Sequence, residues 1–125
     1  MNVELPDLGE LEHEVMQLVW SEGSINAEDV REKLQRKLKE STVRTVLRRL
    51  EGKGFVTHTV DGRTYIYRAV EARERVAAKA VKRIVDWFCN GSVEEVLVGM
   101  VDTLDDHQLQ ALAARIERAK REQGK

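Results

Sequence analysis

The sequence has one cysteine, one proline, few aromatic residues and no long apolar run. A single thiol, Cys89, cannot form a disulfide within the chain or supply a multi-thiolate metal site, so we expect a reducing compartment. No apolar stretch approaches the roughly 18–20 residues that span a bilayer, so no membrane insertion is expected. The opening MNVELPD has neither a basic region nor an apolar stretch behind it. We therefore expect no signal peptide and a cytoplasmic location.

The length of 125 residues fits one compact domain or two very small ones. Hydrophobic residues make up 42% of the chain and charged residues 34%, a mixture typical of a globular, helix-rich protein and not of a disordered one. A chain of this size has little room for a large internal active-site cavity.

The charges are unevenly distributed along the chain, although the net charge is only −1. Residues 1–30 carry eight acidic residues and no lysine or arginine, whereas residues 31–68 carry eleven basic and four acidic residues. Phosphate contacts need local positive charge, so a basic middle segment is compatible with nucleic-acid binding. The alternative is a solvated helical surface on which the charges happen to cluster.

Three segments in the first half have apolar residues at helical spacing. The first covers residues 8–20, and the second begins after Asn26, which is a candidate N-cap. The third opens at Ser41 or a close neighbour and ends between glycines 52 and 54. Its expected inward stripe comprises Val43, Val46, Leu47 and Leu50.

The period then changes to that of strands. Residues 55–60 and 63–70 are β-branched and aromatic runs joined by Asp61-Gly62, which is a strong hairpin signal. A two-residue turn there predicts the pairs Val60–Arg63, His58–Tyr65 and Val56–Tyr67. We expect Val56, Tyr65 and Tyr67 to share a face that packs on the helices.

Helical spacing returns after Val70 and predicts three more helices. The first covers about residues 76–88 and ends at Asn90-Gly91; the second starts at a Ser92/Glu95 capping box, and the third starts near Thr103. Their apolar stripes exceed what three helices can bury by themselves, so we expect a homodimer. The predicted fold is mainly α with a small β-hairpin wing: a winged helix-turn-helix domain at residues 1–70, followed by a helical dimerisation region at residues 71–125.

The third helix carries the candidate DNA-binding residues. With its apolar stripe inward at 100° per residue, the outward positions are Ser41, Arg44, Thr45 and Arg48, with Thr42 and Arg49 on the flank. Arginines one turn apart can reach guanine edges or hold phosphates, and small hydroxyls permit close approach. The outward face from residue 41 to residue 49 has no acidic residue, which disfavours an ordinary solvated surface. In a winged helix this helix enters the major groove of double-stranded DNA, and the hairpin lies against the backbone.

Three motifs resemble those of a known family. They are LGELEHEVM at residues 8–16, TVRTVLRRL at 42–50, and KGFV at 53–56 followed by YIY at 65–67. Their order and spacing resemble the BlaI/MecI/CopY penicillinase-repressor family over nearly the whole chain. The resemblance implies a homodimeric winged-helix repressor whose C-terminal helices dimerise and whose operators are near-palindromes with TACA/TGTA-type half-sites. By position, it implies operator contacts for Thr42, Arg44 and Thr45, and places Arg63 in the wing.

The sequence departs from that family in two places. Copper-sensing members carry a C-terminal cluster of cysteines, which residues 117–125 lack, so copper sensing is not expected. Antibiotic-responsive members are inactivated when a membrane sensor-protease cuts an Asn-Phe bond in the dimerisation region. The matching candidate cleavage site here is Gly99-Met100, which lacks both side chains.

No arrangement of residues suggests catalysis, because there is no Ser-His-Asp order, Cys-His pair or glycine-rich phosphate loop; we expect no enzyme and no cofactor. His13, His58 and His107 lie on different elements without ligand spacing, so no metal site is expected. Two other functions stay open. One is a winged-helix protein-interaction module that does not bind DNA. The other is a ligand-gated winged-helix regulator, which needs a polar-lined cavity near the long helix, where residues 71–88 offer small and aliphatic inward groups.

Overall fold

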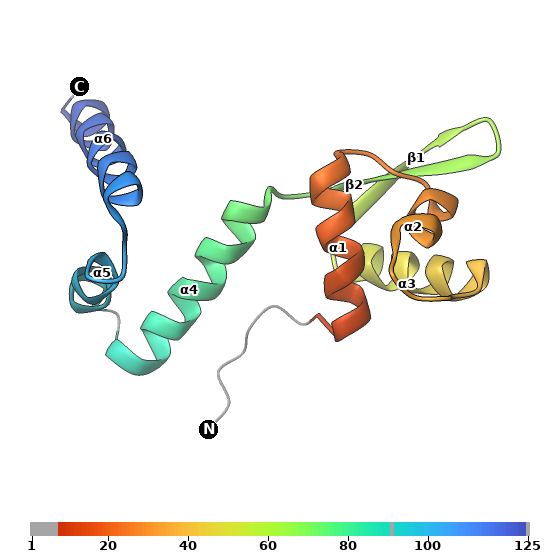
Figure 1. The fold of residues 1–125 in the computed structure, drawn as a ribbon, viewed down its shortest axis with the longest axis horizontal. Coiled ribbons are helices and arrows are strands. Elements are labelled where there is room, and N and C mark those ends of the chain that lie inside the picture. Colours follow the sequence, from red (N-terminus) through yellow and green to blue (C-terminus); the bar gives the residue numbers. More distant parts are fainter. Residues whose placement is uncertain (1–7, 91, 125) are drawn as a thin grey trace. The chain divides into compact units, whose positions relative to one another are not determined.

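A computed structural model describes residues 8–90 and 92–124, which form helices and a two-stranded antiparallel sheet (Figure 1). The elements in chain order are α1 (Glu10–Glu22), α2 (Ala27–Lys33), α3 (Glu40–Gly52), β1 (Val56–Asp61), β2 (Thr64–Ala69), α4 (Arg73–Cys89), α5 (Glu94–Val101) and α6 (Asp106–Gln123). The chain divides into two units at a boundary within α4: the first unit ends at Arg83 and the second begins at Ile84. The predicted fold class, mainly α with a hairpin wing, is confirmed.

The core of the first unit fixes the orientation of α3. All four residues of its predicted inward stripe are buried, with exposed fractions of 4% or less. They belong to one apolar cluster with side chains from α1 and α2, including Val15, Met16, Val19 and Val30. Full burial of one such side chain stabilises the fold by about 1.5–3 kcal/mol, so rotating α3 about its axis is costly. The opposite face of α3 is therefore held toward solvent.

The ends of α2 and α3 follow from local sequence signals. The Asn26 side chain accepts a hydrogen bond of 2.8 Å from the Asp29 N–H, which confirms it as the N-cap of α2. Helix α3 starts at Glu40, one residue before Ser41, with Lys39 as its N-cap. Just after its end, Gly54 has a φ of +85°, a conformation that glycine adopts without strain.

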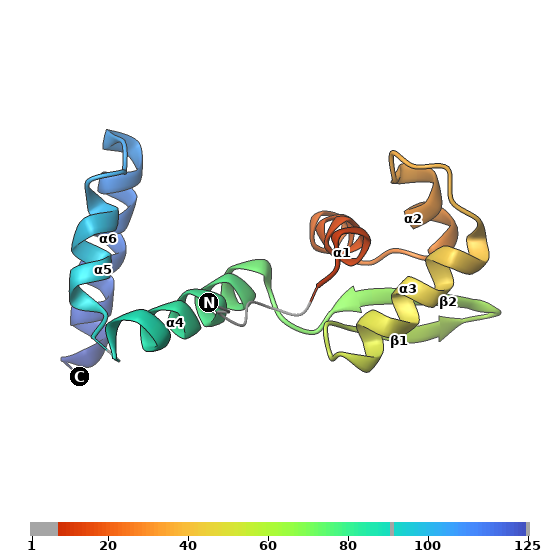
Figure 2. The same ribbon diagram turned by 90° about the horizontal axis from the view of Figure 1, so that it is seen from below.

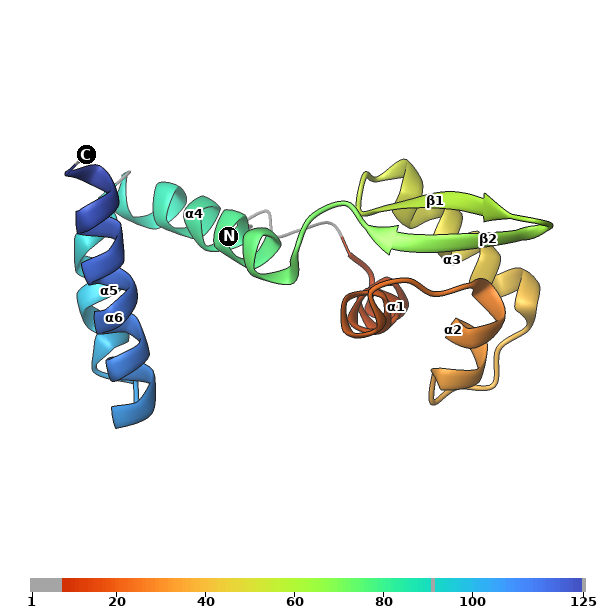
Figure 3. The same ribbon diagram turned by 90° about the horizontal axis from the view of Figure 1, so that it is seen from above.

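The hairpin has a register that differs from the prediction. His58 lies opposite Tyr67 and Val60 opposite Tyr65, so the turn residues are Gly62-Arg63 and not Asp61-Gly62. Gly62 has a φ of +65° at the first central position, which suits a two-residue hairpin loop and requires no left-handed conformation of the aspartate. Arg63 is thus at the tip of the wing. Figures 2 and 3 show the hairpin alongside α3.

The hairpin is only partly packed on the helices. Val56 and Tyr67 are buried as predicted, whereas the prediction for Tyr65 is wrong, because 49% of this side chain is exposed. Tyr67 also exchanges two backbone hydrogen bonds with Ile25, of 2.8 and 3.0 Å, which attach β2 to the segment between α1 and α2.

The three C-terminal helices are present as predicted, but not all of their predicted ends are correct. Helix α4 ends at Cys89, and Asn90 follows with a φ of +50°; Gly91 lies outside the described residues. The predicted capping box of α5 is wrong, because the Ser92 hydroxyl donates to the Glu94 carboxylate and Val93 is the N-cap. Helix α6 starts at a capping box of Asp105 and Gln108.

Large apolar side chains of the C-terminal helices remain exposed within a single chain. They include Trp87, Phe88, Leu97, Val98, Met100, Leu112 and Ile116, with exposed fractions from 37% to 67%. Among the residues that the structure describes, no helix is both long and apolar enough to cross a bilayer.

Candidate nucleic-acid interface

The outward face of α3 carries the side chains that helical geometry placed there. Ser41, Arg44, Thr45, Arg48 and Arg49 are exposed and Thr42 is half-buried. The Thr45 hydroxyl donates to the carbonyl of Ser41 over 2.9 Å, so its oxygen remains available as an acceptor. This face therefore offers guanidinium donors beside small hydroxyl groups.

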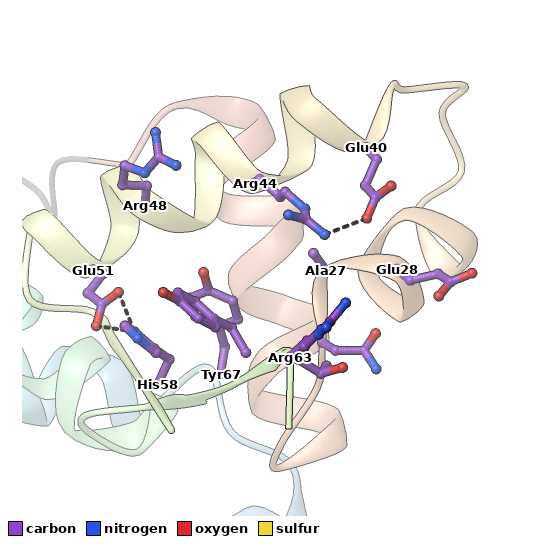
Figure 4. A pocket seen from close by; sticks show the side chains of 12 residues that line it. Ala27, Glu28, Glu40, Arg44, Arg48, Glu51, His58, Arg63 and Tyr67 are labelled. Atoms are coloured by element: carbon purple, nitrogen blue, oxygen red, sulfur yellow. Dashed lines mark hydrogen bonds and ion pairs between the residues drawn. The ribbon is translucent and has the colours of Figure 1, made fainter. Parts of the chain in front are cut away.

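A groove of about 510 Å³ lies between α3, the hairpin and the start of α2 (Figure 4). Arg44 and Arg48 enter its lining from α3, and Arg63 enters from the tip of the hairpin. The structure thus brings together three of the candidate residues from two separate elements. The other four, Ser41, Thr42, Thr45 and Arg49, are not part of this lining.

The arginines of the groove are available to an anionic ligand. Arg44 forms an ion pair with Glu40, with 2.8 Å between Nη2 and Oε1, but both side chains are more than half exposed. An exposed pair one helical turn apart contributes only about 0.3–0.5 kcal/mol, so a phosphate or a base edge can displace the glutamate. Within residues 8–90 and 92–124, no carboxylate lies at ion-pair distance from Arg48 or Arg63.

The acidic residues of α1 pair with basic residues outside the groove. Arg36 lies 2.7 Å from Glu14 and 3.2 Å from Glu10, and Lys53 lies 3.0 Å from Glu12. Partial burial of the Glu12 carboxylate disfavours its charge, but hydrogen bonds from the Gly9 N–H and from Lys53 outweigh burial and lower its pKa. Part of the charge asymmetry of the sequence is therefore neutralised within the fold.

Arg49 belongs to this second electrostatic group. Its positive charge also helps to lower the pKa of Glu12 on α1. The flank position predicted for Arg49 therefore turns it toward α1, which agrees with its absence from the groove lining.

A cluster that sequence reasoning missed connects α3 to the wing. His58 Nδ1 lies 2.7 and 2.8 Å from the two carboxylate oxygens of Glu51, and its ring stacks on Tyr65 with 4.2 Å between centroids and 8° between planes. Burial, reinforced by the negative charge of Glu51, raises the pKa of Tyr67 beside it. The sequence does contain a sign of this cluster: His58 shares a hairpin face with Tyr65 and Tyr67 and follows seven residues after Glu51, in the last turn of α3.

A second hollow of about 400 Å³ lies beside α4, lined by Lys53, Gly54, Phe55, Glu71, Val76, Lys79, Ala80 and Arg83. It corrects the expectation that residues 71–88 offer only small and aliphatic groups. Its glutamate is already engaged: the Lys79 ammonium, 2.7 Å from Glu71, lowers the pKa of that carboxyl group with help from Arg75. Because Glu71 already pairs with Lys79 and Arg75, the lining of this hollow gives no specific evidence for a bound effector.

Three helices, a hairpin wing and an arginine-bearing α3 face beside that wing define a winged-helix transcriptional regulator. The fold is similar to the solution structure of the DNA-binding domain of the repressor BlaI, with 30% identity and a TM-score of 0.51. That match covers 58% of this chain and 90% of the solved domain.

The chain belongs to the penicillinase repressor family, whose sequence profile matches residues 8–118. It is 26% identical to the penicillinase repressor of Bacillus licheniformis over 121 residues, which are 93% of this chain and 94% of that protein. It is also 31% identical to an uncharacterized 16.5 kDa protein of Latilactobacillus sakei over 93 residues, 73% of this chain but only 64% of that protein. The resemblance seen in the sequence is confirmed, and the family consists of transcriptional repressors, not enzymes.

Proposed function

We propose that this chain is a homodimeric repressor that binds a near-palindromic operator through α3 and the wing. The observation that carries the proposal is the common groove whose lining includes Arg44 and Arg48 of α3 and Arg63 of the hairpin tip. With α3 in the major groove, the two α3 guanidinium groups reach base edges, and Arg63 reaches a backbone phosphate. Ser41, Thr42 and Thr45 complete the contact along the helix, and Arg49, on the flank nearer α1, would reach only the phosphate backbone at the edge of the major groove.

The exposed apolar side chains of the second unit support the homodimer. Trp87, Phe88 and Val98 are each more than half exposed within one chain, which is costly unless another surface covers them. Two symmetric half-sites also require two winged-helix domains, spaced by about one helical turn of DNA. In this proposal residues 1–70 contact DNA and residues 71–125 form the dimer.

The proposed function predicts specific and salt-sensitive DNA binding. A duplex with TACA/TGTA half-sites in inverted repeat should bind at least about 10³-fold more tightly than the same duplex with scrambled half-sites. Fluorescence anisotropy titrations at several salt concentrations measure both affinities and their salt dependence. Equal, salt-insensitive binding of both duplexes, or none, would instead favour the protein-interaction module.

The arginines should differ in what their loss does to binding. Arg44→Ala or Arg48→Ala should cost about 1–3 kcal/mol and relax the preference at one base position, because a bidentate contact to a base edge is lost. Arg63→Ala should weaken binding to all duplexes and lower the salt slope by about one unit per protomer. Arg115→Ala, an exposed arginine of α6, removes the same charge and serves as the matched control. A uniform, sequence-independent loss for all three groove variants would mean that α3 touches only phosphates.

We further propose that repression is relieved by a signal that acts on the C-terminal helices. The family resemblance suggests proteolysis by a membrane sensor-protease, but Gly99-Met100 stands where the Asn-Phe pair of the antibiotic-responsive members is expected. Whichever signal acts, we expect it to weaken operator binding by separating the two chains of the dimer.

A further inference from the structure

The outer half of the wing has little support of its own. Two-stranded hairpins are at best marginally stable in isolation, so they depend on packing against the rest of the fold. Val56 is buried at the base of this hairpin and Tyr67 about half-way along it, opposite His58, but Thr59, Val60 and Asp61, which lead to the turn, are exposed. The tip that carries Arg63 therefore needs a further connection if it is to keep a fixed position.

His58 provides that connection between three elements. Its Nδ1–H donates to the carboxylate of Glu51 in the last turn of α3 (Figure 4). Its ring stacks on Tyr65 of the opposite strand. The His58 and Glu51 side chains are only 26% and 33% exposed, so water competes less for this bond than for the Arg44–Glu40 pair. An imidazole donates from Nδ1 in its neutral Nδ1–H tautomer and in its protonated form, so either form can make this bond.

We propose that His58 is a positioning residue that fixes the wing relative to α3, so that Arg63 meets the same duplex as Arg44 and Arg48. This inference rests on the proposed function. The His58–Tyr67 pair lies three residue pairs from the Asp61–Thr64 pair that closes the turn, which corresponds to about 10 Å along the strands. A tilt of about 20° at this anchor would move the tip by roughly 3–4 Å, more than a hydrogen bond to a phosphate tolerates.

A double-mutant cycle between His58 and Arg63 tests this role. His58→Phe keeps an aromatic ring against Tyr65 but removes the donor to Glu51, and His58→Gln keeps a donor but removes the ring. Each is combined with Arg63→Ala, and Thr59→Val, a shape-conserving change at an exposed neighbouring strand position, serves as the control. Affinity and salt slope are measured on the inverted-repeat TACA/TGTA duplex, and thermal unfolding verifies that each variant is folded.

The expected result is non-additivity. His58→Phe alone should lower the salt slope as Arg63→Ala does, and Arg63→Ala should cause about a two- to tenfold smaller loss of affinity in the His58→Phe background than in the wild type. Thr59→Val should leave the effect of Arg63→Ala unchanged. Additive losses in both His58 backgrounds overturn the inference, because they mean that His58 contacts DNA itself or only stabilises the fold.

Amide hydrogen exchange of the hairpin separates this inference from the proposed function. In the free protein, exchange near the turn should be faster in His58→Phe than in wild type, with exchange in α1 unchanged. If the wild type binds no DNA, the proposed function fails while this exchange result still reports on the anchor. Unchanged exchange in both His58 variants overturns the positioning role.

Discussion

The full-length double variant Leu97→Asp/Val98→Asp is expected to lose nearly all operator occupancy while its winged-helix unit stays folded. Both side chains are on α5 and are 51% and 67% exposed in a single chain, so they are available to a second copy. Two carboxylates placed in an apolar interface would be desolvated without a partner, which opposes dimerisation. Separated winged helices lose the effective concentration that links two half-site contacts, a loss of about 10²–10⁴-fold in operator affinity.

Sedimentation and anisotropy on the same samples decide this prediction. The variant should sediment as a monomer at micromolar concentration and bind a single half-site as well as the wild type does. Gln110→Glu, which introduces a negative charge at an exposed polar position of α6, is the matched control and should remain dimeric. A wild-type chain that is monomeric at this concentration and still binds the full operator tightly would contradict the proposed dimer.

The features that were predictable from the sequence are those set by local signals. The inward stripe of α3 follows from helical spacing, and Asn26 caps α2 through a bond to a residue three positions away. Once α3 is oriented by Val43, Val46, Leu47 and Leu50, its outward side chains follow from geometry. The composition of the exposed α3 face could therefore be predicted before the structure was known.

The features that were not predicted are of two kinds. Some depend on which of two similar local conformations the chain adopts, and others depend on contacts between different elements. Gly62 can occupy either central position of a two-residue turn, and local sequence alone does not select between Asp61-Gly62 and Gly62-Arg63. Because the prediction placed the turn at Asp61-Gly62, it paired His58 with Tyr65, whereas His58 lies opposite Tyr67 in the structure. Its bond to Glu51 joins a strand to a helix, and no periodicity reports such a contact. The predicted capping box of α5 is wrong for a related reason, because the Ser92 hydroxyl donates to the nearby Glu94 carboxylate instead of accepting from the Glu95 N–H.

The groove shows how these two kinds of feature combine. The positions of Arg44 and Arg48 depend on helix periodicity alone, but the position of Arg63 depends on the register and on how the hairpin is attached to α3. In the predicted register Arg63 would pair with Val60 and lie on a strand, whereas in the structure it is a turn residue. The chemistry of the candidate interface was therefore predictable, while the spacing between its two halves was not.

A sensor-protease of the family that recognises Asn-Phe is expected to leave the wild-type chain intact and to cut the variant Gly99→Asn/Met100→Phe. The substitution is sterically feasible, because a Cβ atom added at Gly99 meets nothing within 4 Å apart from its chain neighbours and its own helix backbone, and Met100 is 48% exposed within one chain. Replacing glycine in a helix also removes a cost of about 1 kcal/mol relative to alanine, part of which asparagine retains, so α5 should persist. The difference between the two chains would then reflect recognition of the side chains and not loss of the helix.

Co-expression with such a sensor-protease, followed by mass measurement of the fragments, provides the test. The reversed pair, Gly99→Phe/Met100→Asn, has the same composition in the opposite order and should stay intact. A cut at the Asn-Phe bond would leave α6 on a separate fragment from α4, and the operator affinity of the products should fall as it does for the Leu97→Asp/Val98→Asp variant. A clean cut of the wild type between residues 99 and 100 would contradict the expectation and show that this family mechanism operates without the Asn-Phe pair. An uncut double variant would mean that recognition needs more than the two residues, and the inducing signal would then have to reach the dimer by another route.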